Sequence, residues 1–381
     1  MLACYRISKL KRGEPMDDIL TREERLVHGF RALCSQYGYR PYRMSKFEEY
    51  DLYAGFRSFL PAGGVITFTD TNGRLMALKP DVTLSIAKNL TPRPGEPVRV
   101  YYDESVYRAP DRQLGFQEIT QAGLEYLGEV DYYAMGEVVA LAARSLDAID
   151  HGYVLDVSHM GFVTGLIEAL GLGEPARAEL LRAIGMRNAH GIRDICSQAG
   201  AAGAPAQRLC RVASLYGPMR DMIRELRGMS VNSATERALC ELEKLAGVLD
   251  SFGVLDRINL DLSITSDMEY YNGLLFKGYV PGVPSAVLSG GRYDSLLAKL
   301  GKSGGAIGFA LYLNLLERLL EPSGAEYDAD VLLLTDGAAP EAAARAAREI
   351  VSGGESVLVQ RCPGSARCRR TVRMDAEGRL G

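Results

Sequence analysis

Two runs of apolar and β-branched residues, separated by a short polar break, stand out in the first third of the chain. Residues 98–107 carry valine and tyrosine at a density typical of a strand, and residues 119–127 follow a break with proline and glycine. This pattern predicts two antiparallel strands joined by a loop. On the second strand Gln121, Gly123 and Glu125 would share one face, because side chains in a strand repeat every two residues. Such a polar stripe indicates either the floor of a pocket or the solvated face of an antiparallel sheet.

The region before these strands alternates helical and strand patterns. Apolar residues repeat at helical spacing over residues 17–38 and predict a helix. Residues 66–70 and 74–79 predict a hairpin, because the Asn-Gly pair between them suits a turn with two positive φ angles. Asp81 follows a proline and is expected to cap a helix over residues 82–90.

The pattern changes after a strand predicted at residues 153–157. From about residue 160 to 255, strand patterns disappear and alanine, leucine, arginine and glutamate predominate, which predicts a helical insert. Strand patterns then return in three segments, residues 258–265, 274–280 and 286–288. The sequence therefore predicts one large sheet-containing domain over residues 1–325, interrupted by helices.

A smaller unit is expected over residues 326–381. It shows a strand, a helix and a strand in turn, at residues 329–334, 340–352 and 356–360. Residues 361–381 contain six arginines. We expect a solvated charged tail there, with contact to nucleic acid as the less favoured alternative.

Composition narrows the class of protein. The 381 residues are 47% hydrophobic and 24% charged, and the net charge of −4 does not favour a large nucleic-acid surface. Seven scattered cysteines without a C-x-x-C pair and four histidines predict reduced thiols and no structural metal. Without a long apolar segment or a signal-peptide pattern, we expect a soluble cytoplasmic protein. Dinucleotide, P-loop and nucleophile-elbow motifs are absent from the sequence, and no cofactor is expected.

Six short motifs occur in the order found in one family. They are L-K-P-D-V-T at 78–83, V-Y-R and Q-x-G within 106–115, Q-A-G-x-E at 121–125, E-Y-Y-N-G at 269–273, S-G-G-R-Y-D at 289–294 and G-F-A at 308–310. In this combination the chain resembles histidyl-tRNA synthetases over roughly residues 10–320. The resemblance implies an α+β, class II aminoacyl-tRNA synthetase-like fold with an antiparallel sheet of six or seven strands and flanking helices. It also implies a homodimer formed through residues 39–60.

The same resemblance implies a pocket for L-histidine. Transferred motif by motif, its lining comprises Asp81, Thr83, Arg108, Gln121, Glu125, Tyr270, Tyr271 and Tyr293. These residue types suit the ligand, because carboxylates neutralise an α-ammonium group, amides bond imidazole or carboxylate, and tyrosines supply a flat wall.

Each of these residues also has a purely structural interpretation. The two adjacent tyrosines could be core aromatics beside a turn, and Gly290-Gly291 could be a tight turn. Arg108 could form a surface ion pair with Asp111 or Glu118, worth under about 1 kcal/mol. Only their joint match to one family pattern favours the pocket.

Four departures from the synthetase pattern bear on function. Ser266 stands where the synthetases carry an arginine that supports amino-acid activation, and no arginine follows Gly115. A neutral hydroxyl cannot hold developing phosphate charge as a guanidinium does. The glutamate and arginine of the third motif are displaced to Glu317 and Arg318, a weaker difference because the helix phase could compensate. About 55 residues follow Glu326, fewer than an anticodon-binding domain of this family has.

A synthetase-like body without these groups resembles the regulatory subunits of ATP phosphoribosyltransferase. That resemblance implies a non-catalytic partner of a short-form catalytic subunit, joined in a hetero-octamer and responsive to histidine, at the first step of histidine biosynthesis. It implies no nucleic-acid or membrane partner. Two alternatives stay open: a histidyl-tRNA synthetase or amino-acid-activating paralogue, and a stand-alone histidine- or tRNA-binding module. Histidine could also bind at the interface with the catalytic subunit.

Overall fold

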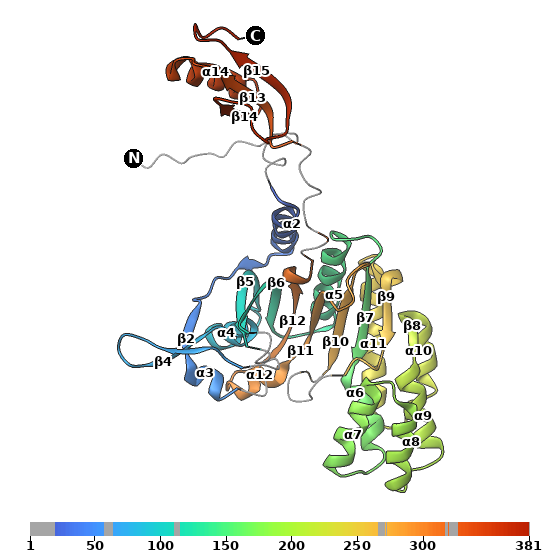
Figure 1. The fold of residues 1–381 in the computed structure, drawn as a ribbon. Coiled ribbons are helices and arrows are strands. Elements are labelled where there is room, and N and C mark those ends of the chain that lie inside the picture. The colour runs from blue at the N-terminus through green and yellow to red at the C-terminus, as the bar shows by residue number, and fades with distance from the viewer. Residues whose placement is uncertain are drawn as a thin grey trace. The chain divides into compact units, whose positions relative to one another are not determined.

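The chain forms two compact units, Met1–Leu320 and Glu321–Gly381, whose elements are labelled in Figure 1. The computed structural model describes residues 20–56, 64–109, 115–265, 271, 273–316, 319 and 327–380. Each unit has its own sheet and its own buried cluster of apolar side chains.

A large sheet organises the first unit. Counted over the described residues it has nine strands, which lie side by side in the order β1 (Arg40–Pro41), β5 (Val98–Arg108), β6 (Gln117–Gly128), β12 (Gly305–Tyr312), β11 (Leu288–Arg292), β10 (Leu274–Tyr279), β7 (Val154–His159), β9 (Ile258–Asp261) and β8 (Tyr216–Pro218). The six or seven antiparallel strands that the resemblance implied are too few, because two short strands, β1 and β8, extend the sheet at its two edges. The β1–β5 and β7–β9 pairs are also parallel.

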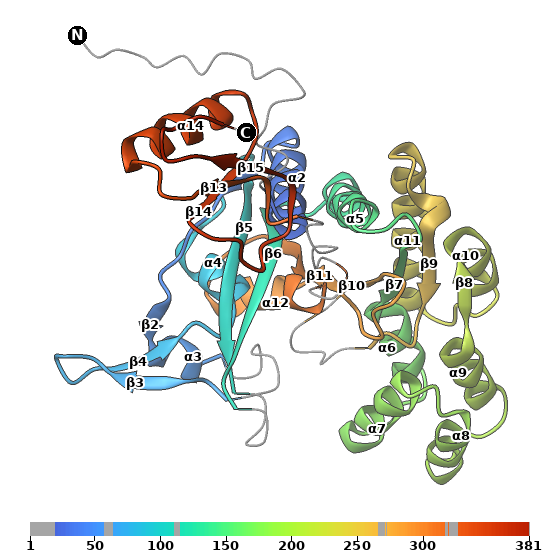
Figure 2. The same cartoon turned by 45° about the horizontal axis from the view of Figure 1, so that its top comes forward.

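The predicted hairpin of long strands is confirmed. Strands β5 and β6 pair antiparallel from Val98 opposite Leu127 to Arg108 opposite Gln117. On its other side β6 pairs with β12. The strand with the polar stripe is therefore hydrogen-bonded on both sides, near the middle of the sheet (Figure 2).

One face of the large sheet carries most of the core. Helices α2 (Arg22–Gln36) and α5 (Tyr132–Asp147) contact it, and α11 (Ser233–Ser251) packs on α5. Leu124, Phe276 and Phe309 are buried on this side. Helix α2 begins later than the pattern suggested, because Thr21 caps it: its hydroxyl accepts from Glu24 N at 3.1 Å, while Thr21 N donates to the Glu24 carboxylate at 2.8 Å.

Two short helices, α4 (Thr83–Asn89) and α12 (Asp294–Lys299), lie on the opposite face. They share a second buried cluster with Tyr102 and Tyr293. Strand β11 runs straight through Gly290 and Gly291, so the interpretation of this pair as a tight turn is wrong. After β12 the chain forms a single 3-10 turn, η3 (Leu313–Leu316).

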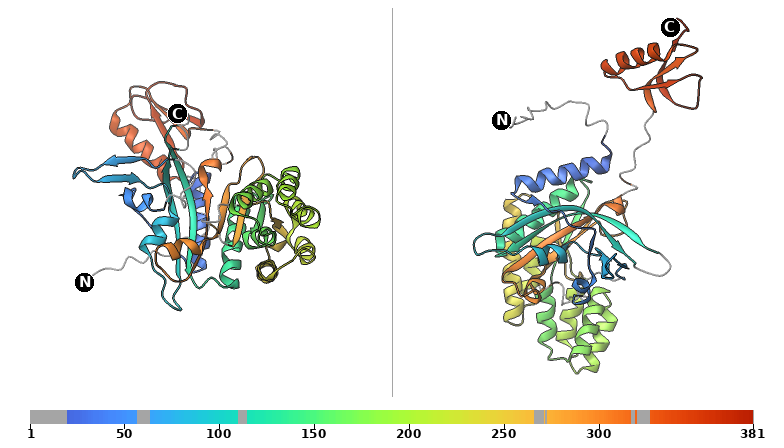
Figure 3. Two further views of the ribbon diagram at one scale, coloured as in Figure 1. Left: turned by 90° about the horizontal axis from the view of Figure 1, so that it is seen from below. Right: turned by 90° about the vertical axis from the view of Figure 1, so that its left-hand side faces the viewer.

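The helical insert is confirmed with one difference. Its elements are α6 (Met160–Glu168), α7 (Glu174–Gly185), α8 (Ala189–Gln198), α9 (Ala204–Ser214), α10 (Met219–Arg227) and α11. Between α9 and α10, strand β8 pairs with β9 and ties the insert to the sheet edge. Helices α6 to α10 gather beyond the β7–β9 end of the sheet (Figure 3, left).

A small separate sheet precedes α4. It consists of β2 (Phe47–Glu49), β4 (Leu75–Leu78) and β3 (Thr67–Thr69), with helix α3 (Tyr50–Ala54) beside it. Strands β3 and β4 form the predicted hairpin, but the expected turn with two positive φ angles is wrong, because only Gly73 of the Asn-Gly pair has a positive φ, +80°. A glycine fits this turn because the left-handed region costs it no steric clash.

The second unit has more structure than the sequence indicated. Strand β13 (Ala329–Thr335), helix α14 (Pro340–Ser352) and strand β14 (Val357–Gln360) match the expectation. However, β15 (Cys368–Met374) pairs parallel with β13, so these residues form a strand and not a tail, although most of their side chains are exposed as expected. Arginines fit in β15 because it is an edge strand, where long charged side chains remain in water.

Among the described residues, no helix is both long and apolar enough to cross a membrane. The cysteines in this part of the chain are free thiols: Cys34, Cys196, Cys210, Cys240, Cys362 and Cys368.

Candidate functional site

The polar stripe of β6 is buried. Gln121 and Glu125 are 4% and 1% exposed, so the alternative of a solvated sheet face is wrong. In the register of the sheet Gly123 lies opposite Tyr102 of β5, and Glu125 lies opposite Gly308 of β12. The stripe therefore forms part of an enclosed polar region under α4 and α12.

Glu125 is bonded by hydroxyl groups. Its carboxylate accepts from Thr83 Oγ1 at 2.6 Å and from the Tyr293 hydroxyl at 2.5 Å. Burial raises the pKa of Glu125 to about 8, although the two hydrogen bonds lower it and the nearby charge of Asp81 raises it further. Among the described residues no cation bonds this carboxylate, so no ion pair with these residues offsets the cost of burying it.

Asp81 contributes a second buried carboxylate. Its Oδ1 accepts from Leu84 N at 2.8 Å, which caps α4 one residue before the helix's nominal N-cap, Val82. Burial raises its pKa, while the backbone bond and the charge of Arg108 lower it. Arg108 donates through Nε to Pro80 O at 3.1 Å. It thus braces the loop before α4, and no ion pair with Glu118 is found.

Glycines make the room for these side chains. A Cβ built on Gly308 would collide with the Glu125 carboxylate, and one on Gly123 would collide with the Tyr102 hydroxyl. At Gly291 it would lie 2.6 Å from Cδ1 of the Tyr271 ring. The glycines of three motifs are therefore explained by close approach of a neighbouring side chain to the sheet.

Tyrosines line the region between these groups. Tyr102 is 2% exposed, and its pKa is raised well above its ordinary value by burial and by the negative charges of Glu125 and Asp81. The hydroxyls of Tyr312 and Ser289 share a hydrogen bond of 2.8 Å. Sequence reasoning missed Tyr102, Ser289 and Tyr312, although the two-residue period of β5, β11 and β12 could have placed them on this face.

Lys79 is also buried, at 1% exposure, and its Nζ bonds Glu104 Oε2 at 2.5 Å. Glu104 stands opposite Gln121 in the sheet. Lys79 is thus paired with a carboxylate of the same sheet.

The structure brings seven of the eight predicted pocket residues onto this sheet face or the elements that flank it: Asp81, Thr83, Arg108, Gln121, Glu125, Tyr271 and Tyr293. Tyr270 lies outside the described residues, as do Asp111, Gln113, Ser266, Glu317 and Arg318. The geometry suits a small cationic or zwitterionic molecule, because buried carboxylates favour an added positive charge.

Comparison of the sequence with those of known proteins shows which proteins the chain resembles. A family model described as Histidyl-tRNA synthetase matches residues 16–316. The ATP phosphoribosyltransferase regulatory subunit of Moorella thermoacetica is 31% identical over 94% of this chain and 91% of that protein. The regulatory subunit of Symbiobacterium thermophilum is 34% identical over 68% of this chain, and the match spans 65% of that protein.

Solved structures agree with the sequence matches. A protein from Bacillus halodurans C, described as an ATP phosphoribosyltransferase regulatory subunit/histidyl-tRNA synthetase, has a TM-score of 0.79 at 26% identity and covers 98% of this chain and 100% of its own. A chain of the ATP phosphoribosyl transferase (HisG:HisZ) complex from Thermotoga maritima has a TM-score of 0.59 at 19% identity, covering 76% and 97%. The predicted class II synthetase-like fold is confirmed.

Proposed function

The chain belongs to the family of ATP phosphoribosyltransferase regulatory subunits, and we propose that it is a non-catalytic subunit that a short-form catalytic subunit requires for activity. In this proposal it also delivers feedback inhibition by L-histidine, at the first step of histidine biosynthesis. The Thermotoga maritima complex, whose HisG:HisZ description names two components, supports a partnership of this kind.

The observation that carries the histidine proposal is the pair of buried carboxylates to which no cation of the described residues is bonded. Glu125 and Asp81 both have raised pKa values, so an incoming α-ammonium group would regain the charge interaction that burial removed. Tyr271 and Tyr293 would supply the wall for an imidazole ring, and Gln121 an amide partner. Such a set also discriminates, because a ligand lacking one polar group leaves a buried partner unsatisfied.

The absence of adenylation chemistry is supported by the surroundings of the pocket. Phe116, which follows Gly115 where the synthetases carry arginines, is 78% exposed. The segment after β12 is the apolar turn η3, with Leu313 and Leu316 buried. In the described part of the chain, the segments next to these two motifs offer no guanidinium to a triphosphate.

A homodimer is proposed through the small β2–β4–β3 sheet. Phe47 and Phe68 are 50% and 39% exposed, and their rings pack edge to face with centroids 5.6 Å apart. Because these exposed aromatic rings lie at or next to the segment expected to form the dimer, their burial against a second copy of the chain would be favourable. A hetero-octamer would then combine two such dimers with four catalytic chains.

The test mixes the purified full chain with the short-form catalytic subunit of the same organism and measures ATP phosphoribosyltransferase activity with and without L-histidine. We expect the catalytic subunit alone to be slow, the mixture to be faster, and histidine to inhibit the mixture. Glu125→Gln and Gln121→Ala should lose the response to histidine but keep the stimulation. Glu129→Gln, at an exposed position beyond the same strand, is the matched control and should behave as wild type.

Three outcomes would overturn parts of this proposal. Histidine-dependent ATP–pyrophosphate exchange by the chain alone would make it an amino-acid-activating enzyme. A response to histidine that survives both pocket variants would move the histidine site to the interface with the catalytic subunit. Failure of the chain both to bind and to stimulate the catalytic subunit would leave a stand-alone binding module.

A further inference from the structure

A second polar cavity lies on the same sheet face, where the helical insert meets β9 and β10. Its volume is about 450 Å³, within the range of small-molecule sites. Seven polar side chains, from the insert and from the segments around β9 and β10, line it: Arg182, Arg187, Asp261, Ser263, Thr265, Lys277 and Tyr279. None of them belongs to the pocket around Glu125.

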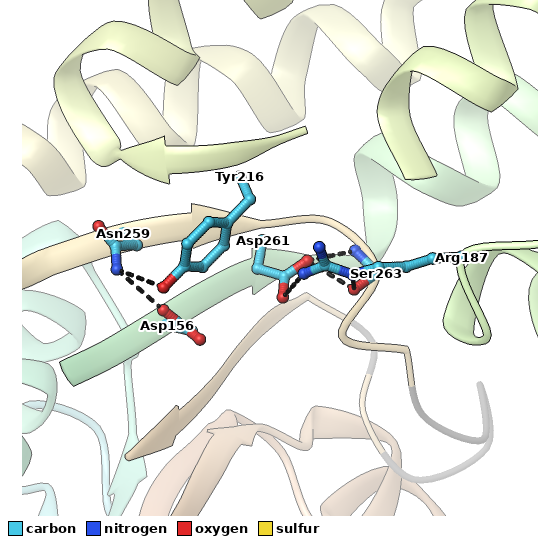
Figure 4. A network of polar contacts seen from close by, with 6 residues as sticks. All are labelled: Asp156, Arg187, Tyr216, Asn259, Asp261 and Ser263. Carbon is cyan, nitrogen blue, oxygen red and sulfur yellow. Dashed lines mark hydrogen bonds and ion pairs between the residues drawn. The ribbon is translucent and has the colours of Figure 1, made fainter. Parts of the chain in front are cut away.

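The lining has an excess of positive charge. Three cations face one carboxylate, Asp261. That carboxylate is already satisfied, because it accepts from Arg187 Nη2 at 2.6 Å and from the Ser263 hydroxyl at 2.6 Å (Figure 4). In the described part of the chain Arg182 and Lys277 form no ion pair, so two positive charges remain for a ligand.

Both the backbone and the side chain of Arg187 are held in place at the edge of the cavity. It is the C′ residue of α7 with φ +51°, the one described non-glycine residue in the left-handed region. Its N–H donates to Ile184 O and that of Asn188 to Ala183 O, both at 2.8 Å, which is the Schellman pattern that glycine usually completes. Its guanidinium also donates to Ser263 Oγ at 3.0 Å and stacks over Tyr216, 5.6 Å from the ring centroid.

The insert and the sheet approach closely here. A Cβ on Gly185 would lie 2.6 Å from Thr265 Oγ1, so the last turn of α7 sits against the segment after β9. Behind the cavity, Asn259 Nδ2 bonds Asp156 at 3.2 Å and the Tyr216 hydroxyl at 3.0 Å (Figure 4). Burial raises the pKa of Asp156, while hydrogen bonds from Asn259 and Tyr216 lower it, and Asp156 lies opposite Lys277 in the sheet.

We propose that this cavity binds the phosphate group of a small phosphorylated metabolite. Arginine presents a planar fork of donors that suits phosphate oxygens, lysine adds a mobile point charge, and hydroxyls complete the shell. A bound phosphate would join α7 to β10, so occupancy would fix the insert against the sheet. The proposal goes beyond the function proposed above, since it requires neither the histidine pocket nor a catalytic partner.

Binding can be followed by fluorescence, because the chain contains no tryptophan. Met186 lines the cavity and is 68% exposed, so Met186→Trp in the full chain places a single reporter at its mouth. The probes are inorganic pyrophosphate, ribose 5-phosphate and AMP at physiological salt, with ribose and adenosine as phosphate-free controls. We expect saturable binding of at least one phosphorylated probe with a Kd below about 1 mM.

Charge-removing variants in this reporter background test the site itself. Arg182→Gln combined with Lys277→Gln should weaken binding at least about tenfold, since two charge-assisted contacts are lost. Arg193→Gln removes an exposed arginine of α8 outside the cavity and should leave the Kd unchanged, as should Glu125→Gln in the other pocket. Unchanged thermal midpoints would show that the variants fold.

Several results would overturn the proposal. One is that no phosphorylated probe saturates, and another is that adenosine binds as well as AMP. A third is that the double variant binds like Arg193→Gln. Binding of an RNA oligonucleotide without any small phosphate would assign the cavity to a nucleic-acid backbone instead.

Discussion

Glu125 and Asp261 are two buried carboxylates on one sheet face. The energetic cost of burying each of them is reduced in a different way. Glu125 is bonded by hydroxyl groups, and its pKa is raised to about 8. Asp261 is 6% exposed as a residue but bonds the guanidinium of Arg187, so its charge is balanced within the protein. The difference indicates which ligand charge suits each region. A positive charge suits the proposed pocket around Glu125, whereas a negative charge suits the cavity beside Arg187, which has spare positive charge.

The largest change in the free energy of unfolding is expected from a substitution that fills the space beside Glu125. Gly308→Ala would push a methyl group into the Glu125 carboxylate and the Leu124 carbonyl. We expect a loss of about 3 kcal/mol in the free energy of unfolding, because overpacking a rigid sheet forces the backbone to move.

Urea unfolding measures this loss. The matched control is Gly247→Ala in α11, where an added Cβ meets nothing within 4 Å. It should be neutral or stabilising by up to about 1 kcal/mol. Equal behaviour of the two variants would mean that the carboxylate does not need the space at Gly308.

A smaller effect is expected from the ionisation of Glu125, which should make the free energy of unfolding depend on pH. The pKa of Glu125 is raised in the folded chain to about 8 from an ordinary value of 4.5, so the folded state binds its proton more tightly than the unfolded state. This contribution to stability is present in full below pH 4.5 and is lost as the pH rises towards 8. The slope approaches about 1.4 kcal/mol per pH unit.

Comparing unfolding free energies at pH 5.5 and 7.5 isolates this slope. Glu125→Gln cannot ionise and should remove it, whereas Glu129→Gln should keep it. Saturating histidine should also flatten it if the ligand brings a positive charge. An identical slope in wild type and Glu125→Gln would contradict a neutral buried carboxyl group.

The smallest effect concerns the conformation of Arg187. Arg187→Ala and Arg187→Gly both remove the guanidinium from Asp261, but only glycine adopts φ +51° without a steric clash. The glycine variant should therefore be more stable than the alanine variant by about 1 kcal/mol.

Thermal or urea unfolding of the two variants, measured side by side, gives this difference directly. Both lose the same ion pair, so their difference reports only the backbone at the end of α7. Equal stabilities would contradict the idea that an arginine is held in a position suited to glycine.

The sequence by itself determined the parts of the chain that carry strong local patterns. The β5–β6 hairpin follows from two runs rich in β-branched and aromatic residues around a break with proline and glycine, and the helical insert follows from a long segment without strand patterns. The hairpin of β3 and β4 is predicted from its Asn-Gly pair, of which only Gly73 needs a positive φ. Motif order likewise groups Asp81, Thr83, Gln121 and Glu125 as candidate pocket residues.

Only the tertiary structure decided features that depend on what lies across the sheet. Strand β11 continues through Gly290 and Gly291 because Phe276 and Tyr271 occupy the space of their missing side chains, which no local pattern reveals. Strand β15 forms at the edge of β13 despite its arginines, since pairing and not propensity holds it there. The charge state of Glu125 and the capture of Asp261 by Arg187 depend on residues far apart in the sequence. Electrostatics of this kind is fixed by burial and neighbours, so it becomes visible only once the chain is folded.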